Sequence, residues 1–178
     1  MKRSAYVLLI IVVSLFLIAL FTVEKKQQSF RNLTQPPQQM LSDDIRGLTF
    51  TDLEGNIVPF AQYIDTPLVL HSWSTWCIFC TREIPDLAEV QTKFADRVHF
   101  VAINRGEGED HITRFIQAHD PNKRLHYLLD DGDLFYTLIG GFAMPETLFI
   151  KANGEIVLHK RGPLTQDEIR AATAALIE

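Results

Sequence analysis

Cysteine is scarce in this chain. The 178 residues contain two cysteines, Cys77 and Cys80, so the disulfide framework of a small secreted scaffold is excluded. Because the two lie three positions apart, they have to be interpreted as one unit. A C-x-x-C pair is either a redox dithiol or half of a metal site.

The chain also lacks the further ligands that a metal or haem would need. There is no second cysteine pair, and none of the six histidines stands at ligand spacing from another. Covalent haem attachment would require a histidine directly after Cys80, where Thr81 stands. A peroxidase would need a separate cysteine in a T-x-x-C setting, which is absent. We therefore expect no metal and no cofactor besides the Cys77/Cys80 disulfide itself.

Positive charge is not in excess. The net charge is −5 and the pI is near 5.7, and no dense Lys/Arg block follows the short Lys25-Lys26 pair. A chain that binds a nucleic-acid backbone normally carries a basic patch. Nucleic acid is therefore not expected as a partner.

The N-terminus carries a long apolar run. Lys2 and Arg3 precede uncharged residues 4–23, which at about 1.5 Å per residue cover roughly the 30 Å of a hydrocarbon core. A cleaved signal peptide usually has a shorter run followed by an A-x-A pattern, and here bulky residues follow the single alanine of 18–23. We predict an uncleaved transmembrane anchor over 1–23. The leading positive charges favour an extracytoplasmic remainder, although Lys25 and Lys26 beyond the run weaken that preference.

Two further parts follow the anchor. Residues 24–44 are polar and rich in Gln and Pro, which predicts a flexible tether. Residues 45–178 alternate between strand-like and helix-like patterns and predict one α/β domain. Strands are expected at 48–51, 57–60, 67–73, 98–103, 126–129, 147–150 and 155–158, and helices at 77–94, around 112–116, at 134–139 and after a capping box of Thr165 and Glu168.

The position of the cysteines favours redox chemistry. They directly follow the apolar strand 67–73 and open the helix 77–94, where free amide groups and the helix dipole stabilise a thiolate. Cys77 is then the attacking sulfur. Cys80, about one turn further on, would resolve the mixed disulfide.

The surrounding residues resemble a known family. Residues 73–85, Trp-Ser-Thr-Trp-Cys-Ile-Phe-Cys-Thr-Arg-Glu-Ile-Pro, match W-x-x-W-C-x-x-C-x-x-E-x-P, the pattern of the TlpA/ResA branch of thioredoxin-like proteins and of its CcmG/DsbE cytochrome c maturation group. Residues 141–150 resemble the segment around the family's cis-proline, with Met144 where an alanine is usual. The resemblance covers roughly 45–178. It implies a thioredoxin-like fold, a central mixed β-sheet flanked by helices.

The resemblance also implies roles for residues beside the dithiol. Met144 and Pro145 would be joined by a cis peptide next to Cys77, with the Met144 backbone pairing with substrate. Glu146 is interpreted as a second acid beside the dithiol, the alternative being an ordinary strand-end charge. Trp76 would form an exposed apolar rim that touches substrate.

Glu83 has a physical argument of its own. It lies three residues after Cys80, on the same side of the helix, where a carboxylate can exchange a proton with that cysteine. The alternative is an exposed glutamate stabilised by the helix dipole. Spacing alone does not distinguish these two roles of Glu83, and the family pattern favours proton exchange with Cys80.

These features predict a reductant. Ile78-Phe79 supplies no charge or donor that would stabilise the thiolate of a strong oxidant, and Glu83 opposes a thiolate as well. The resemblance implies protein disulfides as substrates, among them those of apocytochrome c, and a membrane thiol-electron transporter as donor. It places the domain on the periplasmic side of a bacterial inner membrane. The alternatives are a general extracytoplasmic oxidase or reductase, and a redox-inert interaction module with a permanent disulfide.

Overall fold

The computed structural model describes residue 21 and residues 39–94 and 97–178. The predicted anchor (1–23) and the predicted tether up to residue 38 lie outside the described residues, apart from Phe21. Within the part that is described, no helix is both long enough and apolar enough to cross a membrane. Residues 39–178 form one compact unit.

The centre of this unit is a mixed eight-stranded sheet with the order β1-β8-β7-β4-β5-β6-β2-β3. β4, β5 and β6 run parallel to one another, and the other pairings are antiparallel. The mixed sheet flanked by helices agrees with the prediction. The strands are β1 (Gln39–Met40), β2 (Thr49–Asp52), β3 (Ile57–Pro59), β4 (Leu68–Trp73), β5 (His99–Asn104), β6 (His126–Leu129), β7 (Glu146–Ile150) and β8 (Glu155–Arg161).

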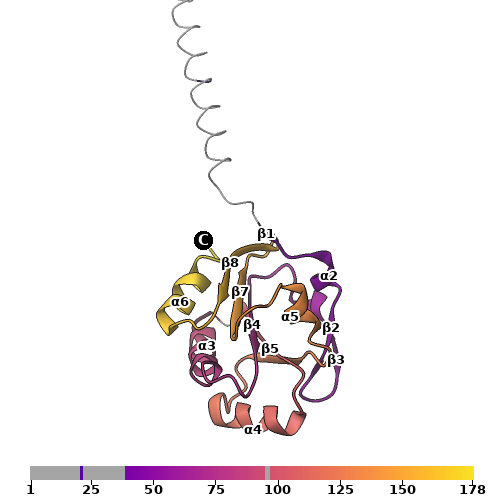
Figure 1. Ribbon diagram of the computed structural model, residues 1–178. Helices are drawn as coiled ribbons and strands as arrows, with labels where there is room; N and C mark the ends of the chain where they lie inside the picture. The colour runs from indigo at the N-terminus through magenta and orange to yellow at the C-terminus, as the bar shows by residue number, and fades with distance from the viewer. Residues whose placement is uncertain (1–20, 22–38, 95–96) are drawn as a thin grey trace, which may run out of the picture. The chain divides into compact units, whose positions relative to one another are not determined.

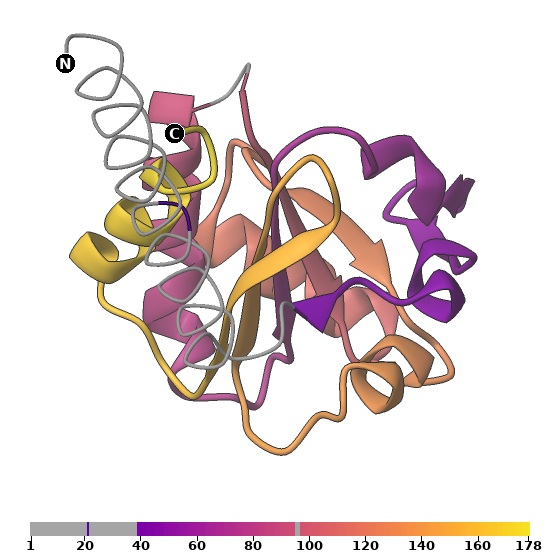
Figure 2. The same ribbon diagram turned by 90° about the horizontal axis from the view of Figure 1, so that it is seen from above.

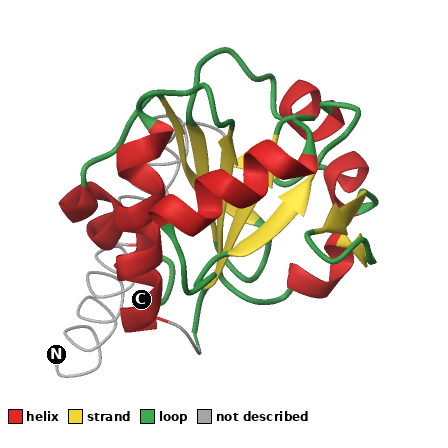
Figure 3. Cartoon of the chain, turned by 90° about the horizontal axis from the view of Figure 1, so that it is seen from below, coloured by secondary structure: helices red, strands yellow, loops and turns green. Residues whose placement is uncertain are grey.

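Helices cover both faces of the sheet (Figures 1 and 2). One face carries α3 (Cys80–Phe94), α4 (Glu109–His119) and α6 (Gln166–Ala174), and the other carries α2 (Asp43–Arg46), the 3-10 helix η1 (Phe60–Tyr63) and α5 (Leu134–Leu138). Figure 3 shows the two helical layers in red on either side of the strands. Each layer has its own apolar cluster against the sheet.

Strand β4 shows how the sheet can have an apolar cluster on each of its two faces. Its six residues are all buried, because it lies between β5 and β7 and is covered on both faces. Successive side chains alternate, so that Val69 and Trp73 join the cluster under α3 while Leu68 and Leu70 join the other. A continuous apolar run is what such a doubly covered strand requires.

The helix after β4 begins later than predicted. Residues 77–79 form a turn, in which the Cys80 amide donates to the Cys77 carbonyl at 3.0 Å, and α3 starts at Cys80. The first i to i+4 bond runs from the Glu83 amide to the Phe79 carbonyl. Cys77 therefore precedes the helix, and its sulfur faces the free amides of the first turn.

The domain also starts earlier than the predicted residue 45. β1 pairs with β8, Leu41 is buried, and Ser42 caps the short helix α2 by accepting a hydrogen bond from the Ile45 amide. Composition could not reveal this, because 39–44 are mostly polar and only Leu41 packs inward. Residues 39–44, predicted as the end of the tether, belong to the fold.

The capping box of α6 is confirmed and can be tested. Thr165 Oγ1 accepts from the Glu168 amide, and the Glu168 carboxylate accepts from the Thr165 amide. Thr165→Ala should lower the free energy of unfolding by about 1 kcal/mol, because one helix-terminal amide loses its acceptor. Thr165→Ser keeps the hydroxyl and should stay within about 0.5 kcal/mol of the parent in urea unfolding. Equal losses for both variants would contradict this account.

Candidate active site

The two cysteines are joined at the carboxyl end of β4. Cys77 and Cys80 form a disulfide, with their Cα atoms 5.3 Å apart. Cys80 is fully buried and Cys77 retains 4% exposure, so substrate can reach only Cys77. The Cys80 amide points at Cys77 Sγ at 3.2 Å. In the reduced form that N–H would stabilise a thiolate on Cys77.

A carboxylate from the loop after β5 holds the turn before Cys77. Glu107 accepts hydrogen bonds from the Thr75 amide at 2.6 Å and from Thr75 Oγ1 at 2.5 Å. The Asn104 side chain fixes Glu107 in turn, through bonds of 2.9 and 3.1 Å. Sequence reasoning missed these hydrogen bonds between Thr75, Glu107 and Asn104. A signal existed, because β4 and β5 are parallel neighbours and the residues that follow them must meet at one edge.

Apolar side chains surround Cys77 in the sequence and remain in solvent. Trp76 is 66% exposed, Ile78 is 70% exposed and Phe79 is about half exposed. Trp73 is fully buried instead and packs on Phe115 at 4.8 Å between ring centroids, so it is a core residue. Exposed aromatic residues beside a reactive sulfur are suited to contact a protein substrate.

Glu83 is buried, which excludes the exposed-glutamate alternative. Its carboxylate accepts from Thr147 Oγ1 of β7 at 3.2 Å and from the Leu164 amide before α6 at 3.1 Å. Burial raises its pKa from 4.5 to about 7, and the two hydrogen bonds only partly oppose that rise. A carboxyl group with such a pKa can both take and return a proton near neutral pH.

A buried histidine lies behind Glu83. His71 Nδ1 is 3.0 Å from Thr147 Oγ1 and 3.6 Å from Glu83 Oε1. Burial lowers the pKa of His71 to about 3, so its imidazole is neutral at physiological pH. The sequence showed only a histidine in an apolar strand, and its partners lie on β7 and α3.

The segment before β7 contains the expected cis peptide between Met144 and Pro145. Met144 packs against the apolar cluster that includes both cysteines. The same segment carries Phe142, which is 86% exposed. The prediction of a cis-proline turn is confirmed, while the role of Met144 and Pro145 in substrate binding stays a prediction.

Glu146, the next residue, is fully buried and holds this segment in place. Its carboxylate accepts from the amides of Phe142 at 2.5 Å and Ala143 at 2.7 Å, and His159 Nε2 lies at 2.6 Å. Burial by itself would raise its pKa, but these partners outweigh it and lower the pKa. The hydrogen bonds found for Glu146 among the described residues therefore stabilise the cis-proline segment. Its role as a second acid beside the dithiol stays a prediction.

The sequence and the fold match known proteins. The model of the AhpC/TSA family matches residues 41–159. The chain belongs to this family. Thiol-disulfide oxidoreductase ResA of Bacillus thuringiensis subsp. konkukian is 21% identical over 76% of this chain and 78% of its own. ResA of Geobacillus kaustophilus is 27% identical over 67% of this chain and 68% of its own.

Solved structures agree. A secreted disulfide oxidoreductase of Mycobacterium tuberculosis, described as homologous to DsbE of E. coli, superposes with a TM-score of 0.69 at 27% identity, over 76% of this chain and 100% of its own. DsbF of M. tuberculosis superposes with a TM-score of 0.68 at 23% sequence identity, over 74% of this chain and 96% of its own. The protein is a thiol:disulfide oxidoreductase of the TlpA/ResA-like, thioredoxin-fold type, with Cys77 and Cys80 as its cysteine pair.

The two buried ionisable groups should give opposite dependences of stability on pH. Folded Glu83 keeps a proton that the unfolded chain releases above pH 4.5, so its contribution to the free energy of unfolding falls by about 3 kcal/mol as pH rises from 4.5 to 7. Folded His71 stays neutral where the unfolded chain binds a proton below pH 6.5, so its contribution falls as pH drops from 6.5 toward 3.

Glu83→Gln isolates the first contribution, because Gln does not titrate. In urea unfolding of the oxidised protein, the stability of the parent relative to Glu83→Gln should decline by about 3 kcal/mol between pH 4.5 and 7. Glu83→Gln itself should gain stability with rising pH up to about 6.5, since the His71 contribution remains. Parallel curves for the two proteins would contradict the raised pKa of Glu83.

Proposed function

We propose that this protein is a membrane-anchored, extracytoplasmic reductant of protein disulfides, with the cysteines of apocytochrome c among its substrates. One observation supports the proposed disulfide reduction. The fully buried Cys80 is followed, one helical turn on, by a buried carboxyl group whose pKa is about 7. That pairing suits a dithiol that must give up protons as it is oxidised.

The exchange balances as two successive displacements. The Cys77 thiolate attacks one sulfur of the substrate disulfide, which forms a mixed disulfide and releases the first substrate thiolate. The Cys80 thiolate then attacks Cys77 Sγ, which releases the second substrate sulfur and forms the Cys77–Cys80 disulfide. The substrate gains two electrons and the protein loses them. A membrane dithiol protein, acting as donor, restores the reduced form.

Glu83 would serve the second displacement. Cys80 is withdrawn from water and has to lose its proton before it can attack. Glu83 lies three residues on along α3, at the same helix side, and its ionised form can accept that proton. In the resting reduced protein, an ionised Glu83 would also raise the thiol pKa of Cys80 and restrain premature exchange.

The cis-proline segment and the apolar rim would receive the substrate. An extended substrate chain can pair with the backbone at Met144, next to Pro145, as an added strand. Trp76 and Phe142 offer apolar area to such a chain, and both are well exposed. Support for the location comes from the apolar run at 4–23 and from the secreted M. tuberculosis relative.

A trapping experiment tests substrate and location together. Cys80→Ala removes the resolving sulfur, so mixed disulfides formed by Cys77 should accumulate and be recovered from the membrane fraction. Cys77→Ala is the matched control and should capture at least tenfold less, because Cys80 is buried. Capture of extracytoplasmic haem-binding proteins or thiol carriers is expected. Recovery of cytoplasmic proteins alone would overturn the proposal.

The reduction potential tests the direction of electron flow. We expect a value near or below that of thioredoxin, about −270 mV, by equilibration with glutathione or dithiothreitol. Phe79→His should raise the potential, because an imidazolium in the dipeptide stabilises the Cys77 thiolate, whereas Phe79→Leu should leave it unchanged. A parent potential above about −150 mV would favour the oxidase alternative. Resistance of Cys77 to alkylation after mild reduction would favour the redox-inert module.

A further inference from the structure

His71 is a buried ionisable residue that the exchange reaction, as described so far, does not use. It lies on β4, on the same face as Val69 and Trp73, which is the face that α3 covers. The ring is almost completely buried. Its Nδ1 is 3.0 Å from Thr147 Oγ1, and that hydroxyl is 3.2 Å from Glu83 Oε1. The three side chains form a continuous chain from β4 through β7 to α3.

The Thr147 hydroxyl has a single proton, so this chain has a direction. When Glu83 is ionised, its carboxylate can only accept, and Thr147 donates to it while accepting from an Nδ1–H of His71. When Glu83 carries a proton on Oε1, it can donate to Thr147, whose own proton then turns toward a bare Nδ1. The second arrangement requires the imidazole proton to be on Nε2.

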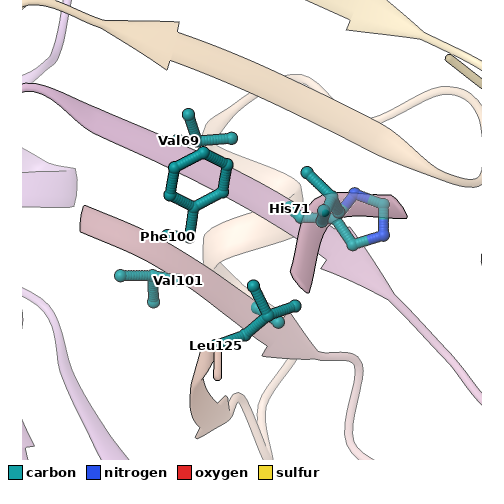
Figure 4. Close-up of a pocket in the computed structure, with 7 residues that line it drawn as sticks. Val69, His71, Phe100, Val101 and Leu125 are labelled. Carbon is teal, nitrogen blue, oxygen red and sulfur yellow. The ribbon is translucent and has the colours of Figure 1, made fainter. Parts of the chain in front are cut away.

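The surroundings of Nε2 favour the first arrangement. Among the described residues Nε2 has no hydrogen-bond partner. The ring borders a pocket lined otherwise by apolar side chains, including Val69, Phe100 and Leu125 (Figure 4), and the pocket is too small for a water molecule. A proton on Nε2 would therefore be a buried donor without an acceptor, which folded proteins rarely tolerate.

We propose that His71 is a positioning residue for thiol–disulfide exchange: as the neutral Nδ1–H tautomer it turns the Thr147 hydroxyl toward Glu83 and favours the carboxylate that receives the proton of Cys80. The inference rests on the proposed role of Glu83. His71 does not relay protons to solvent, because its Nε2 is buried and has no hydrogen-bond partner among the described residues. It sets the hydrogen-bond direction instead.

Other groups also act on Glu83, and they stay constant in the test. Asp86 on α3 raises its pKa, Lys160 on β8 lowers it, and the Leu164 amide before α6 lowers it by donating to Oε2. None of these is changed in the variants below. A difference between variants therefore reports the contribution of the His71–Thr147 pair.

A matched pair of substitutions distinguishes the effect of losing the hydrogen-bond donor of His71 from the effect of losing its ring. His71→Phe keeps an aromatic ring but has no donor, whereas His71→Asn loses the ring but can place an amide N–H where Nδ1 stands. The titration of Glu83 is followed by ¹³C NMR of labelled glutamate carboxyls in the oxidised full chain, with Glu83→Gln to assign the signal. We expect the midpoint to rise by about one pH unit in His71→Phe and to stay within about 0.3 unit in His71→Asn.

Thr147 provides the second arm. Thr147→Val should raise the midpoint at least as much as His71→Phe, Thr147→Ser should leave it near that of the parent, and the double variant His71→Phe/Thr147→Val should add nothing to Thr147→Val. His71→Leu is a second variant without a donor and should behave as His71→Phe. An unshifted midpoint in both donor-less variants, or additive shifts in the double variant, would overturn the proposal.

The reaction gives an independent readout. The rate of disulfide formation from the reduced full chain with a small disulfide is measured against pH, and its midpoint should move with the NMR midpoint in His71→Phe. If Glu83→Gln leaves this rate profile unchanged, the proposed role of Glu83 fails, while the NMR titration still decides whether His71 orients Thr147. The two failures are thus distinguishable.

Discussion

The burial of the Glu83 carboxyl group is the constraint on which the active site depends. Taking a carboxyl group out of water favours its protonated form, and a stable fold must offer it hydrogen-bond partners. Those partners come from β7 and from Leu164 in the loop before α6, while α3 supplies Glu83 itself. The sheet order that places β7 beside β4 brings Thr147 opposite His71. The environment of Glu83 therefore relies on the packing of the whole α3 face.

The buried glutamates Glu83 and Glu146 have opposite pKa shifts because their partners differ. Glu83 receives one hydroxyl and one amide, and its pKa rises. Glu146 receives two amides at short distance and lies against His159, and its pKa falls. With its pKa lowered, Glu146 is ionised at neutral pH and can hold the segment before Pro145 in one conformation. Glu83, close to half ionised near neutral pH, remains available for proton transfer.

The parts of the fold that could be predicted are those with a local cause. The continuous apolar run of β4 and the capping box at Thr165 were visible in the sequence, whereas the cis peptide before Pro145 was implied only by the family resemblance. Cys77 and Cys80 lie three positions apart, so their pairing was visible as well. By contrast, the partners of Glu83 lie 64 and 81 residues away in the sequence, and the hydrogen-bonded residues Thr75 and Glu107 are 32 residues apart. Contacts of that range become visible only when the strand order is known. β1 and α2 were missed because a polar composition hides one buried leucine.

The family relationship leaves the direction of electron flow open, and our proposal of a reductant relies in part on the dipeptide between the cysteines. The AhpC/TSA family match, the ResA relatives and the Cys77–Cys80 pair together support thiol–disulfide exchange, whereas its direction depends on the relative stability of the dithiol and the disulfide. The Cys80 amide is the group within the turn that stabilises a Cys77 thiolate, and Ile78 and Phe79 point apolar surface into solvent instead of adding a charge. A thiolate with so little support gives a dithiol that is readily oxidised. In the proposed exchange, the buried Glu83 would accept a proton as the dithiol is oxidised, so both features support the proposal that electrons pass from this protein to its substrate.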